Sequence, residues 1–356
     1  MDIKGIGMSK ITFYIQMVFV VAYVSATNIS QAQIEDKERP KIGLVLSGGG
    51  ARGAAHVGVL KVLEENKIPV DMIAGTSFGA IVGGLYAAGY TADELETILQ
   101  NIDWQETLSN SAPRRNKSFR RKQDDDGFLI KFKIGFEDGD LKLPGGLITP
   151  NNLRLKLGDL VNSIADVKDF DDLKIPFRAV ATNLENGNEV VLKDGNLASA
   201  MVASMTVPAL FPPVEFDGKL LVDGGVANNI PINVARNMGA DIVIVVDIST
   251  PLLKKDEITS FASVLDQLTM LQSNKAAAEQ IETMTDEDIL IRPDLVEVGF
   301  VDFENAIAAV PKGYEAAIKS MDKLQPLQMT PNDWSSHIRA RMVEQKEQPI
   351  IDFVKI

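Results

Sequence analysis

The clearest pattern in the chain is an alternation of short apolar runs with apolar positions at helical spacing. Residues 42–47 and 70–75 are compact apolar runs that predict two buried strands. Residues 51–66 and 78–88 predict the helices that follow them, and Gly89 ends the second helix. Because strand and helix alternate in this order, we expect a parallel sheet with right-handed crossovers.

The second half of the chain continues the pattern. Residues 177–192 alternate in polarity and turn at Asn186-Gly187, which is typical of a hairpin. Further helices are predicted over residues 151–160, 197–205, 231–238, 261–285 and 313–324, and further strands over residues 219–222, 240–248 and 289–291. The predicted fold class is therefore α/β, with three layers (α/β/α) and a mainly parallel central sheet.

The pattern weakens over residues 104–146, which we interpret as an excursion from the core. Residues 114–122 are strongly basic, residues 124–126 are three aspartates, and residues 128–136 alternate like a strand. The basic run has two interpretations. It contacts anionic lipid headgroups, or it is a solvated loop neutralised by the neighbouring aspartates.

The N-terminus has the features of an export signal. Lys4 and Lys10 precede or begin an apolar run that reaches about residue 26, and Ser30 and Ala32 offer the small residues of a cleavage site before Gln33. The alternative is an uncleaved membrane anchor, although the run is shorter than the roughly 20 apolar residues that a spanning helix needs. We expect an exported protein that is periplasmic, outer-membrane associated or secreted.

These boundaries divide the chain into four parts. Residues 1–32 are the predicted signal peptide, residues 33–40 a charged linker, residues 41–325 the main α/β domain, and residues 326–356 a C-terminal tail. The tail ends in a strand-like run, residues 350–356, which is either the first strand of a further module or an edge strand of this domain.

Composition excludes several classes of function. Of the residues, 45% are apolar and 24% charged, which are ordinary values for a globular protein. The formal net charge of −13 argues against nucleic-acid binding, which needs a basic surface. The absence of cysteine excludes disulfides and thiolate sites, and two histidines, His56 and His337, are too few for a histidine-rich metal site.

A glycine-rich motif links the first predicted strand to its helix. Its residues are Gly48, Gly49, Gly50, Ala51, Arg52 and Gly53. Free backbone amides at such a position bind either a dinucleotide pyrophosphate or the oxyanion of an acyl-transfer intermediate. The dinucleotide alternative expects an acidic residue at the end of the second strand, about 20 residues further on. Asp71 lies at the start of that strand instead, which argues against a dinucleotide cofactor.

The second motif is G-x-S-x-G, again between a predicted strand and a helix. It places Ser77 between Gly75 and Gly79. In this context the motif is typical of a nucleophile elbow, a sharp turn that exposes a serine hydroxyl above the sheet edge. Ser77 is therefore the candidate nucleophile.

The third motif, Asp223-Gly224-Gly225, follows an apolar strand and supplies a candidate base. A Ser-His-Asp triad needs a histidine that reaches the serine. His56 lies inside the first helix, whereas His337 lies in the polar tail but has the chain order of a triad. If neither histidine serves, a carboxylate must accept the serine proton, and Asp223 is the carboxylate that a motif carries.

Taken together, the three motifs resemble the patatin-like phospholipase family, in particular its bacterial branch. The resemblance covers roughly residues 41–324 and includes the proline-rich stretch 203–214. It implies a Ser77-Asp223 dyad, an oxyanion site formed by the amides of Gly49, Gly50 and Ala51, and no metal or organic cofactor. The implied substrate is a fatty-acyl ester of a lipid or phospholipid, and a membrane surface is a candidate partner.

Three points stay open at this stage. Arg52 either fixes the loop, binds a lipid phosphate or forms a salt bridge with a carboxylate. Candidates for the apolar pocket wall are Phe78, Leu210, Phe211 and Val226, with core packing as the alternative role for each of them. The alternative function is a non-catalytic binding or secretion-assembly module at the outer membrane that keeps the patatin fold.

Overall fold

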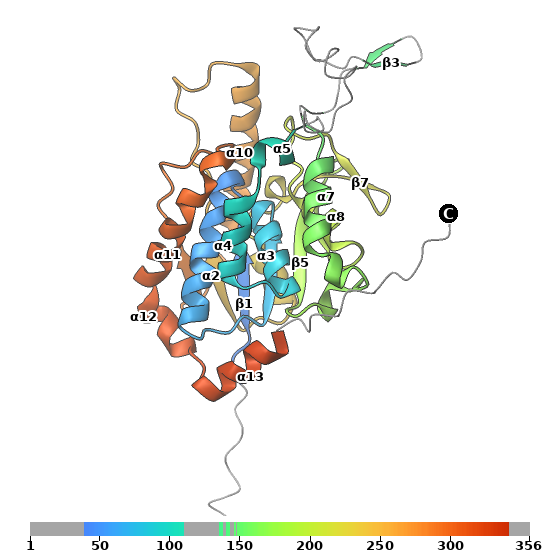
Figure 1. Ribbon diagram of the computed structural model, residues 1–356. Coiled ribbons are helices and arrows are strands. Elements are labelled where there is room, and N and C mark those ends of the chain that lie inside the picture. Colours follow the sequence, from blue (N-terminus) through green and yellow to red (C-terminus); the bar gives the residue numbers. More distant parts are fainter. Residues whose placement is uncertain (1–38, 110–134, 138–139, 143–145, 147, 342–356) are drawn as a thin grey trace, which may run out of the picture. The chain divides into compact units, whose positions relative to one another are not determined.

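The computed structural model describes residues 39–109, 135–137, 140–142, 146 and 148–341 (Figure 1). The chain divides into two units, Met1–Pro40 and Lys41–Ile356, and every element named below belongs to the second. The predicted signal peptide, the basic run 114–122 and the strand-like run 350–356 lie outside the described residues.

An eight-stranded mixed sheet forms the centre of the second unit. Its strand order is β10-β9-β1-β2-β5-β8-β7, and β6 pairs with β5. Neighbours among β10, β9, β1, β2 and β5 are parallel, whereas β6 and β8 run antiparallel to β5, and β7 runs antiparallel to β8. The strands are β1 (Ile42–Leu46), β2 (Met72–Thr76), β5 (Phe177–Asn183), β6 (Glu189–Leu192), β7 (Val214–Phe216), β8 (Lys219–Asp223), β9 (Ile242–Val246) and β10 (Ile289–Ile291), with a separate hairpin of β3 (Gly135–Glu137) and β4 (Asp140–Lys142).

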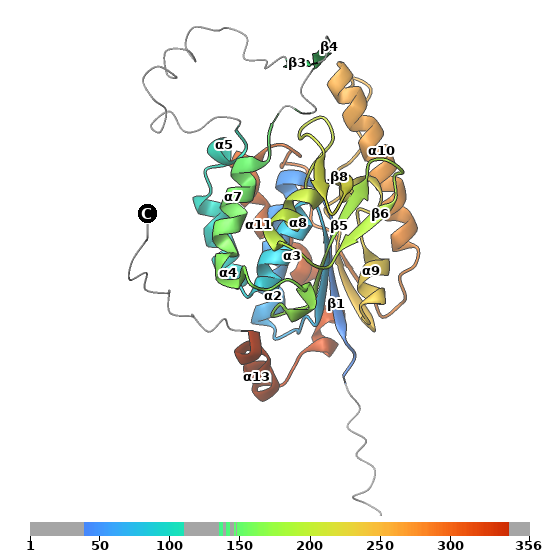
Figure 2. The same ribbon diagram turned by 90° about the vertical axis from the view of Figure 1, so that its right-hand side faces the viewer.

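Helices cover both faces of this sheet. Figure 2 shows α2, α3, α8 and α11 on one face and α9 and α10 on the other. The main helices are α2 (Ala55–Glu65), α3 (Phe78–Ala88), α4 (Ala92–Asn101), α5 (Trp104–Thr107), α7 (Asn151–Leu160), α8 (Leu197–Ser204), α9 (Ile232–Asn237), α10 (Phe261–Ile281), α11 (Ala309–Lys319), α12 (Met321–Leu324) and α13 (Pro331–Arg341). Short 3-10 helices include η1 (Gly50–Ala54), η3 (Asn162–Ile164), η4 (Phe170–Asp172), η5 (Gly224–Val226), η6 (Phe303–Ala308) and η7 (Gln325–Leu327).

The side chains of β1 show how the sheet is buried on both sides. Leu44 and Leu46 belong to the larger apolar cluster, whereas Val45 belongs to a second cluster on the opposite face, and all three are fully buried. Alternate residues of a strand point to opposite faces, so a continuous apolar run is what a doubly covered strand needs. The predicted three-layer fold class with a mainly parallel sheet is confirmed.

Some elements differ from their predictions. The predicted helix over residues 51–66 begins as the 3-10 helix η1 before α2 continues it. The sequence analysis missed α4, although a reciprocal capping box marks its start: Glu94 N–H donates to the Thr91 hydroxyl, and the Glu94 carboxylate accepts from Thr91 N–H. By contrast, the boundaries of α3 and β10 are as predicted.

The pairing register places the C-terminal ends of β1, β2 and β8 at the same edge of the sheet. Leu46 of β1 pairs with Gly75 of β2, so the segments that follow these two strands start side by side. Thr76 pairs with Val180 of β5, whose next residue pairs with Asp223 of the antiparallel strand β8. The glycine-rich loop, Ser77 and Asp223 therefore meet at one edge, where open α/β sheets place their sites.

Candidate active site

Ser77 occupies a strained turn between β2 and α3. Its backbone has φ 54° and ψ −124°, and a positive φ is uncommon for a residue with a side chain. The turn brings Gly79 against β1, where a Cβ would collide with the Leu46 carbonyl oxygen, and Gly75 closely approaches the backbone at Gly79. These features are those of a nucleophile elbow, as the motif predicts.

The backbone of Ser77 is tied to a residue that the motifs do not include. Ser77 N–H donates to Ser204 Oγ at 2.8 Å, and Ser204 Oγ in turn donates to the Val180 carbonyl at 2.5 Å. Ser204 is fully buried at the end of α8. This chain of two hydrogen bonds fixes the elbow to strand β5.

Asp223 is held in place on three sides. Its N–H donates to the Thr206 carbonyl at 2.8 Å, and its own carbonyl accepts from the Thr182 hydroxyl at 2.8 Å. The side-chain oxygen Oδ1 accepts from Gly225 N–H at 2.7 Å, while Gly224 packs against the Val180 carbonyl. The Asp-Gly-Gly motif thus forms a turn that aims the carboxylate.

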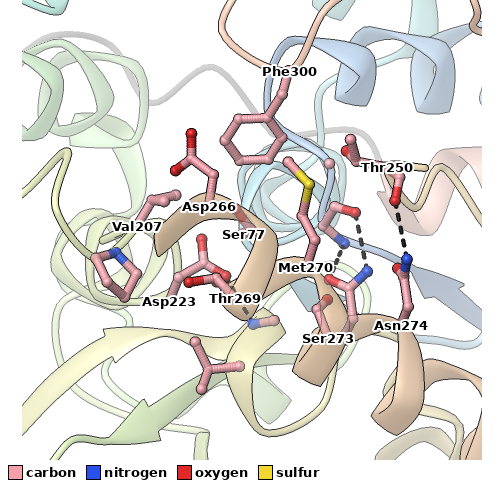
Figure 3. Close-up of a pocket in the computed structure, with 16 residues that line it drawn as sticks. Ser77, Val207, Asp223, Thr250, Asp266, Thr269, Met270, Ser273, Asn274 and Phe300 are labelled. Carbon is pink, nitrogen blue, oxygen red and sulfur yellow. Dashed lines mark hydrogen bonds between the residues drawn. The ribbon is translucent and has the colours of Figure 1, made fainter. Parts of the chain in front are cut away.

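Burial changes the electrostatics of this carboxylate. Asp223 is 6% exposed, and burial raises its pKa to about 6, with the Ser77 hydroxyl and Gly225 N–H acting in the opposite direction. Although Ser77 is near enough to affect that pKa, Oδ2 of Asp223 has no partner of hydrogen-bonding geometry among the described residues. Asp223 thus has a buried carboxylate close to the Ser77 hydroxyl, and its Oδ2 makes no other hydrogen bond among the described residues. Figure 3 shows Ser77 and Asp223 next to each other in one pocket.

The glycine-rich loop is held by side chains from distant parts of the chain. Asn229 accepts from Gly48 N–H at 3.1 Å through Oδ1 and donates to the Gly48 carbonyl at 3.2 Å through Nδ2. Ala51 N–H donates to the Phe300 carbonyl at 2.9 Å, next to Gly50, whose φ is +59°. The expectation that the Ala51 amide serves an oxyanion is wrong for this structure, because that amide is already bonded.

The remaining loop amides differ from those of Gly48 and Ala51. The N–H groups of Gly49 and Gly50 make no comparable hydrogen bond within the part of the chain that the structure describes. Gly49 lines the same pocket as Ser77. The loop therefore leaves the Gly49 amide available in the pocket of the serine, followed by the Gly50 amide in the chain.

Arg52 fixes the loop, which decides between the three alternatives for this residue. Its guanidinium donates to the carbonyls of Val298 at 2.8 Å, Leu295 at 3.2 Å and Ser249 at 3.3 Å. The side chain is 7% exposed, and burial lowers its pKa. Because each guanidinium nitrogen donates to a backbone carbonyl and the side chain is buried, the structure favours the loop-fixing role of Arg52 over a phosphate or carboxylate partner.

Gly53 of the glycine-rich loop packs against the ring of Phe78, the residue after Ser77. A Cβ at Gly53 would collide with the Phe78 ring, which packs 6.0 Å from the Trp104 ring and 6.2 Å from the Phe303 ring, between centroids. Phe78 is fully buried there and does not line the pocket around Ser77. Of the two roles considered for Phe78, the structure therefore favours core packing over the wall of this pocket.

Neither histidine is placed to act on Ser77. His56 is fully buried, its Nε2 lies 2.9 Å from the Ser47 carbonyl, and burial lowers its pKa to about 4, so the ring is neutral and donates to that carbonyl. His337 stacks on Trp334 within α13, which lies at the opposite end of the sheet from the elbow (Figure 1). A Ser-His-Asp triad is excluded by this arrangement.

The pocket around Ser77 is an open cleft of about 610 Å³, including space open to solvent. The middle of α10, from Asp266 to Asn274, forms one wall, which the sequence analysis did not foresee. Val226 lines the pocket as predicted, whereas Leu210 and Phe211 do not. The lining residues are Gly48, Gly49, Ser77, Val207, Pro208, Asp223, Gly225, Val226, Asn229, Thr250, Asp266, Thr269, Met270, Ser273, Asn274 and Phe300.

The charges in this lining all have one sign. Asp223 and Asp266 are its ionisable residues, and among the described residues no lysine or arginine lines the pocket. Burial also raises the pKa of Asp266. The described residues hold no group of three or more potential metal ligands, and none of the described helices is long and apolar enough to cross a membrane.

Comparison with known sequences adds a family to this geometry. The sequence model of the patatin-like phospholipases matches residues 44–236, which contain all three motifs. The mouse patatin-like phospholipase domain-containing protein 6 is 34% identical over 211 residues, which are 59% of this chain and 14% of the mouse protein. Lysophospholipase NTE1 of Mycosarcoma maydis is 30% identical over 303 residues, covering 79% of this chain and 15% of the fungal protein.

A shorter relative and two solved structures complete the comparison. An NTE family protein of Mycobacterium bovis is 31% identical over 217 residues, covering 61% of this chain and 51% of that protein. VipD from Legionella pneumophila aligns with a TM-score of 0.45 at 17% identity, over 80% of this chain and 67% of VipD. Human GIVD cytosolic phospholipase A2 aligns with a TM-score of 0.38 at 12% identity, over 87% of this chain and 61% of the human protein. The matched region is thus a small part of the larger relatives.

Proposed function

The chain belongs to the patatin-like phospholipase family, and on this premise we propose that it is a serine acyl hydrolase that cleaves fatty-acyl esters of lipids. Ser77 is the nucleophile and Asp223 the general base. One observation carries the proposal: a serine on a strained elbow shares a pocket with a buried carboxylate whose pKa is raised to about 6. A base with a pKa near the working pH combines proton affinity with a populated ionised form.

In the first step, Ser77 Oγ attacks the ester carbonyl carbon while its proton passes to Asp223 Oδ2. The carbonyl oxygen becomes an oxyanion, for which the amides of Gly49 and Gly50 are the available donors. A preorganised donor of this kind contributes about 2.7–4 kcal/mol to transition-state stabilisation in other serine hydrolases. The tetrahedral intermediate then expels the alcohol, which takes the proton from Asp223 and leaves an acyl-serine.

In the second step, water attacks the acyl-serine carbonyl and gives a proton to Asp223. The new intermediate breaks the bond between carbon and Ser77 Oγ, and Asp223 returns its proton to that oxygen. The products are a fatty acid and the regenerated hydroxyl. Each proton that leaves a nucleophile passes through one carboxylate, so no histidine is needed.

The pocket favours neutral or zwitterionic lipids as substrates. Val207, Val226 and Met270 supply apolar surface for an acyl chain. Two carboxylates and no cation among the described lining residues offer nothing that would attract a free phosphate or an anionic headgroup. One relative is named a lysophospholipase, and a lysophospholipid with a choline headgroup is a substrate that fits this lining.

Hydrolysis by purified protein tests the proposal. We expect the wild type to release fatty acid from lysophosphatidylcholine, and the Ser77→Ala and Asp223→Asn variants to lose at least about a thousandfold in kcat. Ser273→Ala is the matched control, because Ser273 lines the same pocket but takes no part in the proposed proton transfers. Full activity in Ser77→Ala would refute the proposed nucleophile, and inactivity of the wild type toward every ester would favour a binding module.

We further propose that the protein is exported after cleavage behind Ala32. The weakly basic start, the apolar run to about residue 26 and the small residues Ser30 and Ala32 support this proposal. N-terminal sequencing of the protein from its own cells tests it. A mature chain that begins at Gln33 is expected, whereas an intact Met1 in the mature protein would support the membrane-anchor alternative.

A further inference from the structure

The first half of α10 carries an exposed apolar stripe. Val264, Leu268 and Leu271 are 45%, 58% and 45% exposed. Successive residues of an α-helix are turned by about 100°, so positions i, i+4 and i+7 lie on one face. Three large apolar side chains are therefore aligned along one side of this helix and are open to solvent.

The opposite side of the same helix faces the catalytic pocket. Asp266, Thr269, Met270 and Ser273 line that pocket, and by the same geometry they lie roughly half a turn away from the stripe. This part of the helix thus reverses the usual pattern, with mostly polar residues facing the pocket and apolar residues facing solvent, whereas Ala276 and Ala277 further along α10 are buried. Neither the core nor the pocket accounts for the apolar side.

Neighbouring segments add to the apolar surface. Leu252 is 42% exposed, and hydrogen bonds between the backbone of Leu253 and the side chain of Gln267 tie this segment to α10. Val296 is 84% and Val301 67% exposed, on either side of Phe300, which lines the pocket. Figures 1 and 2 show the first turns of α10 extending past the strand ends. Residues of α10 also line the pocket.

We propose that these exposed apolar side chains dock the protein onto a lipid bilayer, beside the elements that line the pocket. We define the docking surface by six residues: Leu252, Val264, Leu268, Leu271, Val296 and Val301. The inference rests on the proposed function, because a pocket that takes acyl chains from a bilayer must first reach it. Exposed apolar side chains on a helix gain free energy when they enter the boundary between headgroups and acyl chains.

The size of the docking surface favours a bilayer over a second protein copy. A stable dimer buries about 800 Å² on each partner, from about 20–30 residues. Six side chains on three separate segments supply far less than that. A bilayer needs no shape complementarity, so it can accept each apolar side chain separately.

Charge selects the kind of bilayer. The formal net charge of −13 gives the protein no general attraction to an anionic surface. Docking through apolar side chains also has little dependence on salt, since screening acts on charges. We therefore expect binding to zwitterionic phosphatidylcholine vesicles that persists at high salt.

The test compares the double variant Leu268→Asp/Leu271→Asp with Ile318→Asp. Ile318 on α11 is the matched control, since it is 43% exposed but lies outside the docking surface. We expect flotation with phosphatidylcholine vesicles to weaken at least about tenfold in the double variant. Hydrolysis of vesicle lipid falls in parallel, while turnover of a soluble short-chain p-nitrophenyl ester and the thermal midpoint stay unchanged. Ile318→Asp behaves as wild type.

Two results would overturn the inference. If the double variant bound vesicles as tightly as the wild type, another surface would be the one that docks. If the double variant had a lower mass than the wild type in sedimentation velocity, the stripe would be a contact with a second copy. Failure of the proposed function gives a different result. The wild type would then hydrolyse neither the soluble ester nor vesicle lipid, but the flotation assay would still measure whether it binds vesicles.

Discussion

The backbone N–H of Ser77 donates a 2.8 Å hydrogen bond to the hydroxyl of Ser204, which itself donates to the Val180 carbonyl. The elbow is therefore fixed through a buried side chain of α8 and not through its own turn alone. The same bond occupies the Ser77 amide, so this amide is not a free donor for an oxyanion. Ser204 is thus a positioning residue for the proposed nucleophile.

Removal of that hydroxyl should impair turnover more than binding. In Ser204→Ala, both the Ser77 amide and the Val180 carbonyl lose a partner, which costs about 1–3 kcal/mol for each buried group left unsatisfied. We expect kcat to fall at least about tenfold with KM nearly constant, because the nucleophile loses its orientation. Steady-state kinetics and thermal unfolding measure both effects. Ser199→Ala in the same helix is the control, and an unchanged kcat in Ser204→Ala would contradict the positioning role.

The raised pKa of Asp223 predicts a dependence of activity on pH. A general base must be ionised, so kcat/KM should fall as the pH drops through the pKa of about 6. The fall should be about tenfold for each unit below that value. A pH-rate profile with a soluble ester checks this. An acid limb near pH 4, the ordinary range of an aspartate, would show that Asp223 is not the titrating base.

The free energy of unfolding should also depend on the protonation of Asp223, but here the protonated form is the favourable one, whereas catalysis needs the ionised form. Burial raises the pKa of folded Asp223 above its unfolded value, so the protonated form stabilises the fold. That contribution is fully present below about pH 4 and is lost as the pH rises through about 6. At pH 8, Asp223→Asn should therefore be more stable than the wild type by on the order of 3 kcal/mol. The difference should vanish below pH 4, and a variant that is less stable at pH 8 would contradict the assignment.

Asp266 should set the preference for headgroup charge. It lines the pocket from α10, and no lysine or arginine among the described residues lies beside it there. In Asp266→Lys we expect hydrolysis of phosphatidylglycerol relative to phosphatidylcholine to rise at least about threefold, because the sign of the charge in the lining reverses. Asp256→Lys makes the same change in net charge outside the pocket. Equal shifts in the two variants would assign the effect to net charge alone.

The sequence motifs predicted the main parts of the candidate site because each motif is local. The G-x-S-x-G turn, the Asp-Gly-Gly turn and the glycine-rich loop each follow a strand, and the sheet register then brings them together. No motif could predict which distant residues hydrogen-bond to the glycine-rich loop and to Ser77. Asn229 on Gly48 and Ser204 on Ser77 are contacts between residues 181 and 127 positions apart. An isolated asparagine or serine gives no local signal of such a role.

One correction and one feature that was not predicted have the same physical origin. The Ala51 amide looked available because it belongs to the glycine-rich loop, but a segment about 250 residues later supplies the Phe300 carbonyl that it binds. Helix α10 was predicted as a helix, yet its apolar stripe gave no sign of which face meets the pocket. Helical periodicity assigns an apolar face to the core by default. The first half of α10 departs from that rule, since mostly polar residues face the pocket there, whereas Ala276 and Ala277 further along the helix are buried as the rule expects.

Covalent labelling with a fluorophosphonate tests the central claim most directly. The probe forms a stable bond with an activated serine, and peptide mapping by mass spectrometry identifies the residue. We predict stoichiometric labelling of Ser77 in the wild type, none in Ser77→Ala, and labelling at least about a hundredfold slower in Asp223→Asn. Labelling of another serine, or a wild-type rate in Asp223→Asn, would contradict the account.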